Sequence, residues 1–175
     1  NKEEEISKQI HKYTYNTATA NEILDTTDFV YEADGKTPFD VSKAGEGYYR
    51  HDSEGRILEI KHYATVEAKQ VSDLVGSTFP PGAAEAGIKY TMISGDWDTM
   101  MELIRGNDYN AYNFASSFPS VVYDPYTAFH SDFATTSNTP SISDPELDKA
   151  IEAIRSIEPG DVDAFEDAFV NYVVK

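Results

Sequence analysis

Strand-like and helix-like segments alternate along this chain, and the alternation constrains its fold more than any other feature. Residues 56–64, 87–93 and 109–115 have the two-residue apolar alternation and the β-branched or aromatic content of strands. The segments between and after them repeat apolar residues at helical spacing. This order places neighbouring strands in parallel under a cover of helices. We therefore predict an α/β fold, a layered domain with a central mixed, largely parallel sheet flanked by helices.

Capping residues and glycines predict where the first helices begin and end. Asn16 is the expected N-cap of a helix over residues 14–24. Residues 25–55 carry repeated turn signals and form an irregular excursion with aromatic side chains to fix it. Thr65 is expected to begin a helix that carries Val71, Leu74 and Val75 and ends at Gly76, before a loop through residues 80–82.

Three later helices have equally clear signals. Asp96 is expected to cap a helix that Gly106 ends, and a capping box of Ser143 and Glu146 is expected to begin another. Asp161 begins the last. The helix after Asp96 has its apolar stripe at Trp97, Met100, Met101 and Ile104. We expect Trp97, Met101 and Ile104 to contribute to folding stability.

Composition excludes several functional classes. With 14 basic and 31 acidic residues, the net charge of −17 argues against nucleic acid or anionic lipid as a partner, since both require a cationic face. The chain has no cysteine, which excludes disulfides, thiolate metal sites and cysteine nucleophiles. No apolar run approaches the roughly 18 residues of a membrane span. The length of 175 residues suits a single domain, 1–175.

No catalytic or metal-binding motif is present. The four histidines have neither of the short spacings typical of zinc sites, so no metal or other cofactor is expected. Nucleophile-elbow, phosphate-loop and dinucleotide-binding motifs are absent as well. An acidic chain always offers carboxylate pairs, but their separation in space cannot be read from sequence. We therefore do not expect an enzyme.

The segment after the third strand is the candidate site. No Lys or Arg occurs from Gly106 through Asp148, and aromatic side chains alternate there with serines and prolines. Such residues could pack locally, but aromatic walls with a few polar groups are also typical of binding clefts, and α/β sheets bind ligands beyond the carboxyl ends of their strands. The candidate ligand-binding residues are Phe114, Ser116, Ser117, Phe118, Tyr123 and Asp124.

From Tyr15 onward the chain resembles the second lobe of the extracytoplasmic solute-binding proteins of peptide/nickel ABC importers. YNTATANEILD is similar to their YDPEKAKELLDEAG helix, and GEGYYRHDSEGRILEIKHYAT to their approach to a strand. GIKYTMISGDWDTMMELIRGNDYNAYNF follows, and then DPYTAF and SDPELDKAIEAIRS match the family's DP and PelDkL segments. The order of the five segments is that of the family.

The resemblance implies a two-lobed fold around a cleft, with this chain as part of the second lobe. It implies capture of an oligopeptide or related small solute outside the membrane and delivery to the transmembrane permease of a bacterial ABC importer. The expected full-length protein is a monomeric periplasmic protein or cell-surface lipoprotein, whose first lobe, signal peptide and lipid-anchoring cysteine lie outside this piece. By itself the piece is expected to fold as a three-layer unit and to bind solute poorly.

The same resemblance leaves the usual amine anchor in doubt. Peptide binders of this family carry a W-x-x-D-Y-x-D-P segment, whose first Asp pairs with the amino terminus of the peptide. Counting back from Asp124 places Val121 at that position, and counting forward from Asp108 places Pro119 there. Either Asp124 replaces the missing carboxylate, or the ligand is not held by a terminal amine. We expect Phe118 and Tyr123 to contribute to ligand affinity in either case.

Two alternatives stay open at this point. An oligosaccharide would suit aromatic side chains without nearby cations as well as a peptide would. From a different class, an acidic extracellular hydrolase with a carboxylate pair would have the same composition.

Overall fold

The structure is a computed structural model that describes residues 2–106, 109–113 and 123–175. It forms two compact units. One comprises the described residues of Thr14–Ala115, and the other those of Asn1–Tyr13 and Ser116–Lys175. We call them the sheet unit and the helical unit.

The sheet unit contains three parallel strands, β1 (Glu59–Thr65), β2 (Lys89–Gly95) and β3 (Ala111–Tyr112), in the order β2-β1-β3. β1 pairs with β2 along its whole length, and its His62 lies opposite Ala111 of β3. The prediction of an α/β fold with a largely parallel sheet is confirmed. Both connections carry helices, as parallel crossovers require.

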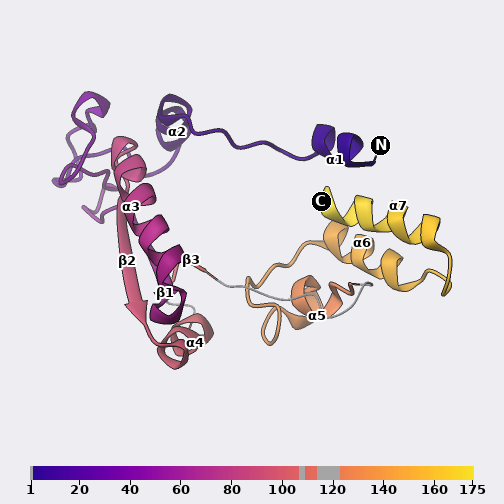
Figure 1. The fold of residues 1–175 in the computed structure, drawn as a ribbon. Helices are drawn as coiled ribbons and strands as arrows, with labels where there is room; N and C mark the ends of the chain where they lie inside the picture. Colours follow the sequence, from indigo (N-terminus) through magenta and orange to yellow (C-terminus); the bar gives the residue numbers. More distant parts are fainter. Residues whose placement is uncertain (1, 107–108, 114–122) are drawn as a thin grey trace. The chain divides into compact units, whose positions relative to one another are not determined.

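Helices cover both faces of this sheet. Successive side chains of a strand point to opposite faces, so Met92 and Ile93 of β2 face different helices. Met92 lies against α3 (Lys69–Glu85), which runs along β2 (Figure 1), whereas Ile93 packs with the buried residues of α4 (Trp97–Arg105). The predicted layered arrangement is therefore present in this unit.

The core of the sheet unit lies between α4 and β1. Tyr63, Met100 and Ile104 form a buried cluster there, and Met101 packs against it partly buried. Asp96 caps α4 as predicted, because its side chain accepts a hydrogen bond of 2.8 Å from the Thr99 N–H. The prediction that Trp97 belongs to the buried stripe is wrong, because this residue is 47% exposed at the first position of the helix.

The helix after Thr65 differs most from the sequence prediction. Thr65 caps only a 3₁₀ turn, Val66–Ala68, and α3 then continues through Gly76, Pro80 and Pro81 to Glu85. Val71 and Leu74 of the predicted stripe are exposed. An internal proline removes a helix hydrogen bond and costs about 3 kcal/mol, so the C-terminal half of α3 depends on tertiary contacts.

Those contacts come from the segment before α3 in the chain. α2 (Thr17–Leu24) begins at Asn16, as predicted, with a 3.0 Å cap to the Thr19 N–H. Asn21 of α2 donates a hydrogen bond of 3.3 Å to the Glu85 carbonyl. Arg50, from the excursion 25–55, donates one of 3.1 Å to the carbonyl of Ala86 directly after α3. Sequence patterns within α3 contain none of this information.

Arg50 also connects the excursion to α2. Its guanidinium, which is fully buried, donates hydrogen bonds to the Phe29 carbonyl (3.2 Å) and to Asn21 Oδ1 (2.9 Å). It pairs with Asp25 Oδ1 at 2.8 Å and lies over the Phe39 ring, 4.6 Å from its centroid. The excursion is irregular but ordered, as predicted, and contains one 3₁₀ turn, Val41–Lys43.

The helical unit consists of α1 (Lys2–Gln9), the short α5 (Tyr126–Phe129), a 3₁₀ turn at Ser131–Phe133, α6 (Pro145–Arg155) and α7 (Val162–Val173). α6 and α7 pack side by side (Figure 1). Asp161 caps α7 as predicted, through the Ala164 N–H at 3.1 Å. α6, however, is capped by Asp144 and not by Ser143, because Pro145 forces the residue before it into the extended conformation that an N-cap requires.

Within the described ranges, no helix has the length and apolar character needed to cross a membrane.

Candidate functional site

Two of the six predicted ligand-binding residues, Tyr123 and Asp124, are within the described part of the chain. Phe114, Ser116, Ser117 and Phe118 lie outside the described residues. Tyr123 and Asp124 belong to the helical unit and come directly before α5. Their contacts show what this end of the predicted segment can offer a ligand.

Asp124 is half exposed, and both of its carboxylate oxygens have partners. Oδ1 accepts a hydrogen bond of 3.0 Å from the Tyr126 N–H, which fixes the turn into α5. Oδ2 lies 3.4 Å from Nε of Arg155, the last residue of α6. A cationic ligand at Asp124 would therefore share the carboxylate with Arg155.

Arg155 was not identified from the sequence, yet it borders a small polar cavity. Its guanidinium lies 4.1 Å from the centroid of the Tyr126 ring, a cation–π arrangement. Both side chains, with Glu152 and Ser156, line a cavity of about 400 Å³. The Tyr126 hydroxyl donates a hydrogen bond of 2.9 Å to Asp132 Oδ2, and this bond raises the pKa of Tyr126.

Carboxylates surround a buried histidine beside this cavity. His130 Nδ1 accepts a hydrogen bond of 3.1 Å from the Asp132 N–H, and its Nε2 lies 3.5 Å from Glu152 Oε1. Asp148 Oδ1 lies 3.9 Å from the same nitrogen of His130. Asp148 also accepts two hydrogen bonds from Ser131, which lower the pKa of Asp148. In the described part of the chain, no three His, Asp or Glu side chains are placed to hold a metal ion.

Tyr123 is half buried. Burial, and secondarily the charge of Asp124, raises the pKa of its phenol. Tyr172 of α7 has its pKa raised to about 12, mainly by burial and also by the charge of Tyr123. Both phenols therefore stay protonated at neutral pH.

Three polar side chains of the sheet unit, Tyr90, His62 and Asn113, are in hydrogen-bond contact with one another in that order. Asn113 is the last described residue before residue 114. His62, buried in the middle of β1, contacts the Tyr90 hydroxyl through Nδ1 and Asn113 Oδ1 through Nε2, the latter at 2.7 Å. Burial raises the pKa of Tyr90. These contacts orient the Asn113 side chain at the carboxyl end of β3. His62 is thereby explained as a hydrogen-bonded core residue.

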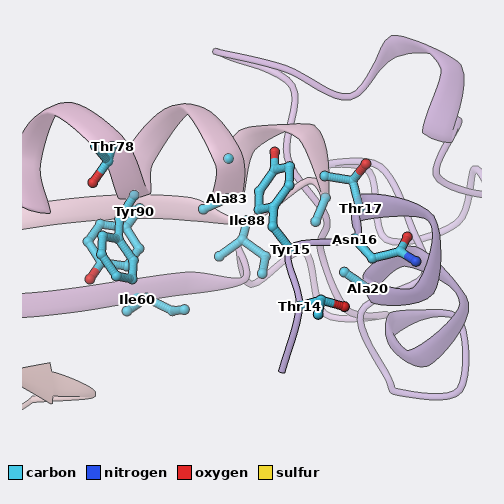
Figure 2. A pocket seen from close by; sticks show the side chains of 13 residues that line it. Thr14, Tyr15, Asn16, Thr17, Ala20, Ile60, Thr78, Ala83, Ile88 and Tyr90 are labelled. Carbon is cyan, nitrogen blue, oxygen red and sulfur yellow. The ribbon is translucent and has the colours of Figure 1, made fainter. Parts of the chain in front are cut away.

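A cavity of about 500 Å³ lies elsewhere in the sheet unit (Figure 2). Its walls come from the segment before α2, from α2, from α3 and the turn after it, and from the second residues of β1 and β2. The lining residues are Thr14, Tyr15, Asn16, Thr17, Ala20, Ile60, Thr78, Phe79, Gly82, Ala83, Ala86, Ile88 and Tyr90. We call this cavity the ring pocket, after its three aromatic side chains.

No protein-family model matches the chain, and no curated protein does. Solved structures do match. The oligopeptide-binding protein AppA of Bacillus subtilis, in complex with a nonapeptide, is 17% identical with a TM-score of 0.72, over 94% of this chain and 30% of that protein. NikZ of Campylobacter jejuni, in complex with Ni(L-His), is 13% identical with a TM-score of 0.67, over 95% and 31%.

The chain has the fold of part of an ABC-importer solute-binding protein. A periplasmic oligopeptide-binding protein of Thermotoga maritima, with bound mannohexaose, matches with a TM-score of 0.68 and 16% identity over 98% of this chain and 30% of that one. The structural neighbours are thus binding proteins of the peptide/nickel type, and the resemblance seen in the sequence is confirmed at the level of the fold. The chain spans about 30% of the length of these neighbours.

Proposed function

We propose that the chain is part of the second lobe of a two-lobed solute-binding component of an ABC importer. The observation that supports this most strongly is the shared fold over nearly the whole chain with binding proteins of such importers. In this proposal the full-length protein binds a small solute outside the membrane and delivers it to a permease. A hydrolase receives no support from these neighbours, because two of them are oligopeptide-binding proteins and the third was crystallised in complex with Ni(L-His).

An oligopeptide is the proposed solute. The fold is that of a protein crystallised with a nonapeptide, and the segment from Gly106 through Asp148 has aromatic side chains and no Lys or Arg of its own. Asp124 is the proposed carboxylate for that amine, in competition with Arg155 at 3.4 Å. Phe114, Ser116, Ser117, Phe118 and Tyr123 remain proposed contacts of the peptide.

An oligosaccharide is the second candidate. A neighbour of the same fold contains mannohexaose, and aromatic faces with protonated phenols suit sugar rings and hydroxyls. This candidate does not need Asp124 to accept a terminal amine.

A thermal-shift screen of the full-length protein against oligopeptides and neutral oligosaccharides tests the proposal. A ligand at 100 times its dissociation constant stabilises the folded state by about 2.7 kcal/mol. We expect oligopeptides to raise the melting temperature, and Asp124→Asn to weaken the effect of free-amine peptides more than that of N-acetylated ones. If oligosaccharides alone raise the melting temperature, the second candidate is correct. If neither class does, the proposed function is wrong.

A further inference from the structure

The ring pocket has walls without charge. None of the 13 residues that line it is acidic or basic, although charged residues make up 26% of the chain. Its volume of about 500 Å³ is within the range of about 300–1,000 Å³ that is typical of small-molecule sites. A charged ligand group would lose its hydration there without gaining a partner, so the lining selects an uncharged occupant.

Three aromatic rings from three different segments give the pocket its shape. Tyr15 precedes α2, Phe79 belongs to α3 and Tyr90 to β2. The rings of Phe79 and Tyr90 lie 5.8 Å apart at an angle of 32°. In Figure 2 the Tyr15 ring stands near Ala83 and Ile88. Aromatic surface thus meets the cavity from more than one side.

The hydroxyls of two of the rings have partners within the protein, although the Tyr15 ring is 76% exposed. The Tyr15 hydroxyl donates a hydrogen bond of 2.9 Å to Glu85, and the Tyr90 hydroxyl contacts His62. Gly82 allows the Tyr15 ring to approach α3, because a Cβ added there would lie 3.1 Å from Tyr15 Cε2. Because Tyr90 contacts the buried His62, its part of the wall is preformed, which lowers the entropic cost of binding.

Several polar groups of the lining are also engaged within the protein. Asn16 Oδ1 accepts the Thr19 N–H, and the Thr78 hydroxyl donates to the Leu74 carbonyl. With the two tyrosine hydroxyls bonded as well, the pocket offers mainly aromatic and aliphatic surface. Aromatic pairs in offset or tilted geometry gain about 0.5–1.5 kcal/mol beyond the burial of their area.

We propose that the ring pocket is a binding site for an uncharged aromatic ring. The site goes beyond the proposed solute capture, because it lies at the other end of the strands. Ile60 and Tyr90, the second residues of β1 and β2, line it, whereas sheets of this kind bind ligands beyond their carboxyl ends, here Thr65 and Gly95. The ring could belong to a free small molecule or to the side chain of a peptide.

Saturation-transfer NMR on the 175-residue chain tests this site with three probes, indole, N-acetyltryptophanamide and benzoate. We expect saturable binding of indole and at least tenfold weaker binding of benzoate, whose carboxylate the pocket cannot pair. Binding of N-acetyltryptophanamide as tightly as indole would indicate a ring carried by a peptide. Binding of indole alone would indicate a free small molecule.

Two variants locate the site and a third is the matched control. Ala83→Leu fills the pocket and should weaken indole at least tenfold. Gly82→Ala shifts the Tyr15 ring by only a few tenths of an ångström and should weaken indole by less. Ala153→Leu is the same substitution of Ala by Leu, but at an exposed position of α6 in the helical unit. It should leave indole binding unchanged. Circular dichroism confirms that each variant is folded.

Three results would overturn the proposal. They are the absence of saturable indole binding, indole binding that both pocket variants leave intact, and benzoate binding as tight as that of indole. Sedimentation velocity adds a fourth. If the chain forms a dimer that Ala83→Leu abolishes and indole does not compete with, the occupant is a second copy of the chain. None of these measurements depends on whether the full-length protein captures a solute.

Discussion

Replacement of Arg50 by Met should destabilise the sheet unit more than any other single loss of charge. Met fills a similar length but donates no hydrogen bond. The change leaves the carbonyls of Phe29 and Ala86 and the Oδ1 atom of Asn21 without their donor. Each buried acceptor left unsatisfied costs about 1–3 kcal/mol.

The ion pair itself adds little to this total. Asp25 is 58% exposed at its side chain, so water replaces the guanidinium as its partner. Retained packing of the methionine on Phe39 offsets a part of the loss. We therefore expect a net loss of about 3–5 kcal/mol, which is the sum of three acceptors left without a donor less the retained packing. This is a large fraction of the roughly 5–15 kcal/mol that stabilises an ordinary domain.

Urea denaturation followed by tryptophan fluorescence measures this loss in the correct unit, because the only tryptophan, Trp97, belongs to the sheet unit. Lys69→Met is the control. Lys69 also pairs with an aspartate, Asp73, but the two side chains are 76% and 63% exposed, so the change should cost less than about 1 kcal/mol. A loss below about 1 kcal/mol for Arg50→Met, with an unchanged denaturant slope, would refute the reasoning.

Three further predictions concern single positions. Gly47 and Gly87 both have positive φ, so replacement of either by Ala costs roughly 1–2 kcal/mol of left-handed backbone strain. Gly87→Ala should cost more than Gly47→Ala, because only the Cβ at Gly87 would meet Phe39, at 2.6 Å. Equal losses of the two variants in urea titrations would contradict the clash. Asp34 has its pKa lowered to about 2 by hydrogen bonds from Thr37 and Lys36, so its contribution to stability is complete above the ordinary value of 3.8 and is lost as the pH falls towards 2. The urea midpoints of the natural chain and Asp34→Asn should accordingly converge over that interval, and a gap that stays constant would disprove the assignment. Ile104→Ala should lower the free energy of unfolding by about 2–4 kcal/mol, measured by circular dichroism, because Ile104 is buried. Trp97→Ala should lower it clearly less, because Trp97 is 47% exposed. The reverse order would place the core elsewhere.

The features that the sequence predicted correctly depend on residues that lie close together in the chain. Asn16, Asp96 and Asp161 cap their helices through N–H groups three residues later, so each signal is complete within one turn. The strands were recognised from alternation over a few residues, and their parallel pairing follows from the helices between them. The resemblance to solute-binding proteins depended on the order of such local segments.

The features that the sequence did not predict depend on contacts between distant segments. α3 continues through Pro80 and Pro81 because Asn21 and Arg50 bind the backbone at its end, and neither residue carries a local signal for that role. Arg155 lies beside Asp124 only because α6 folds back on the segment before α5. Trp97 has the helical spacing of the buried stripe, but it is the first residue of α4 and is 47% exposed. Spacing alone does not show whether the sheet covers the first turn of a helix.

Isothermal titration of an oligopeptide into the full-length protein and into the 175-residue chain tests the central claim most directly. The peptide that stabilises the full-length protein most is the one to use. A cleft closes over its ligand with contacts from both lobes, so removal of one lobe should lower the affinity by several kcal/mol, and each 1.4 kcal/mol is tenfold in the dissociation constant. We predict micromolar or tighter binding by the full-length protein and at least hundredfold weaker binding by the chain alone. Equal affinities would contradict a cleft shared between two lobes, and the absence of heat with both proteins would contradict peptide capture.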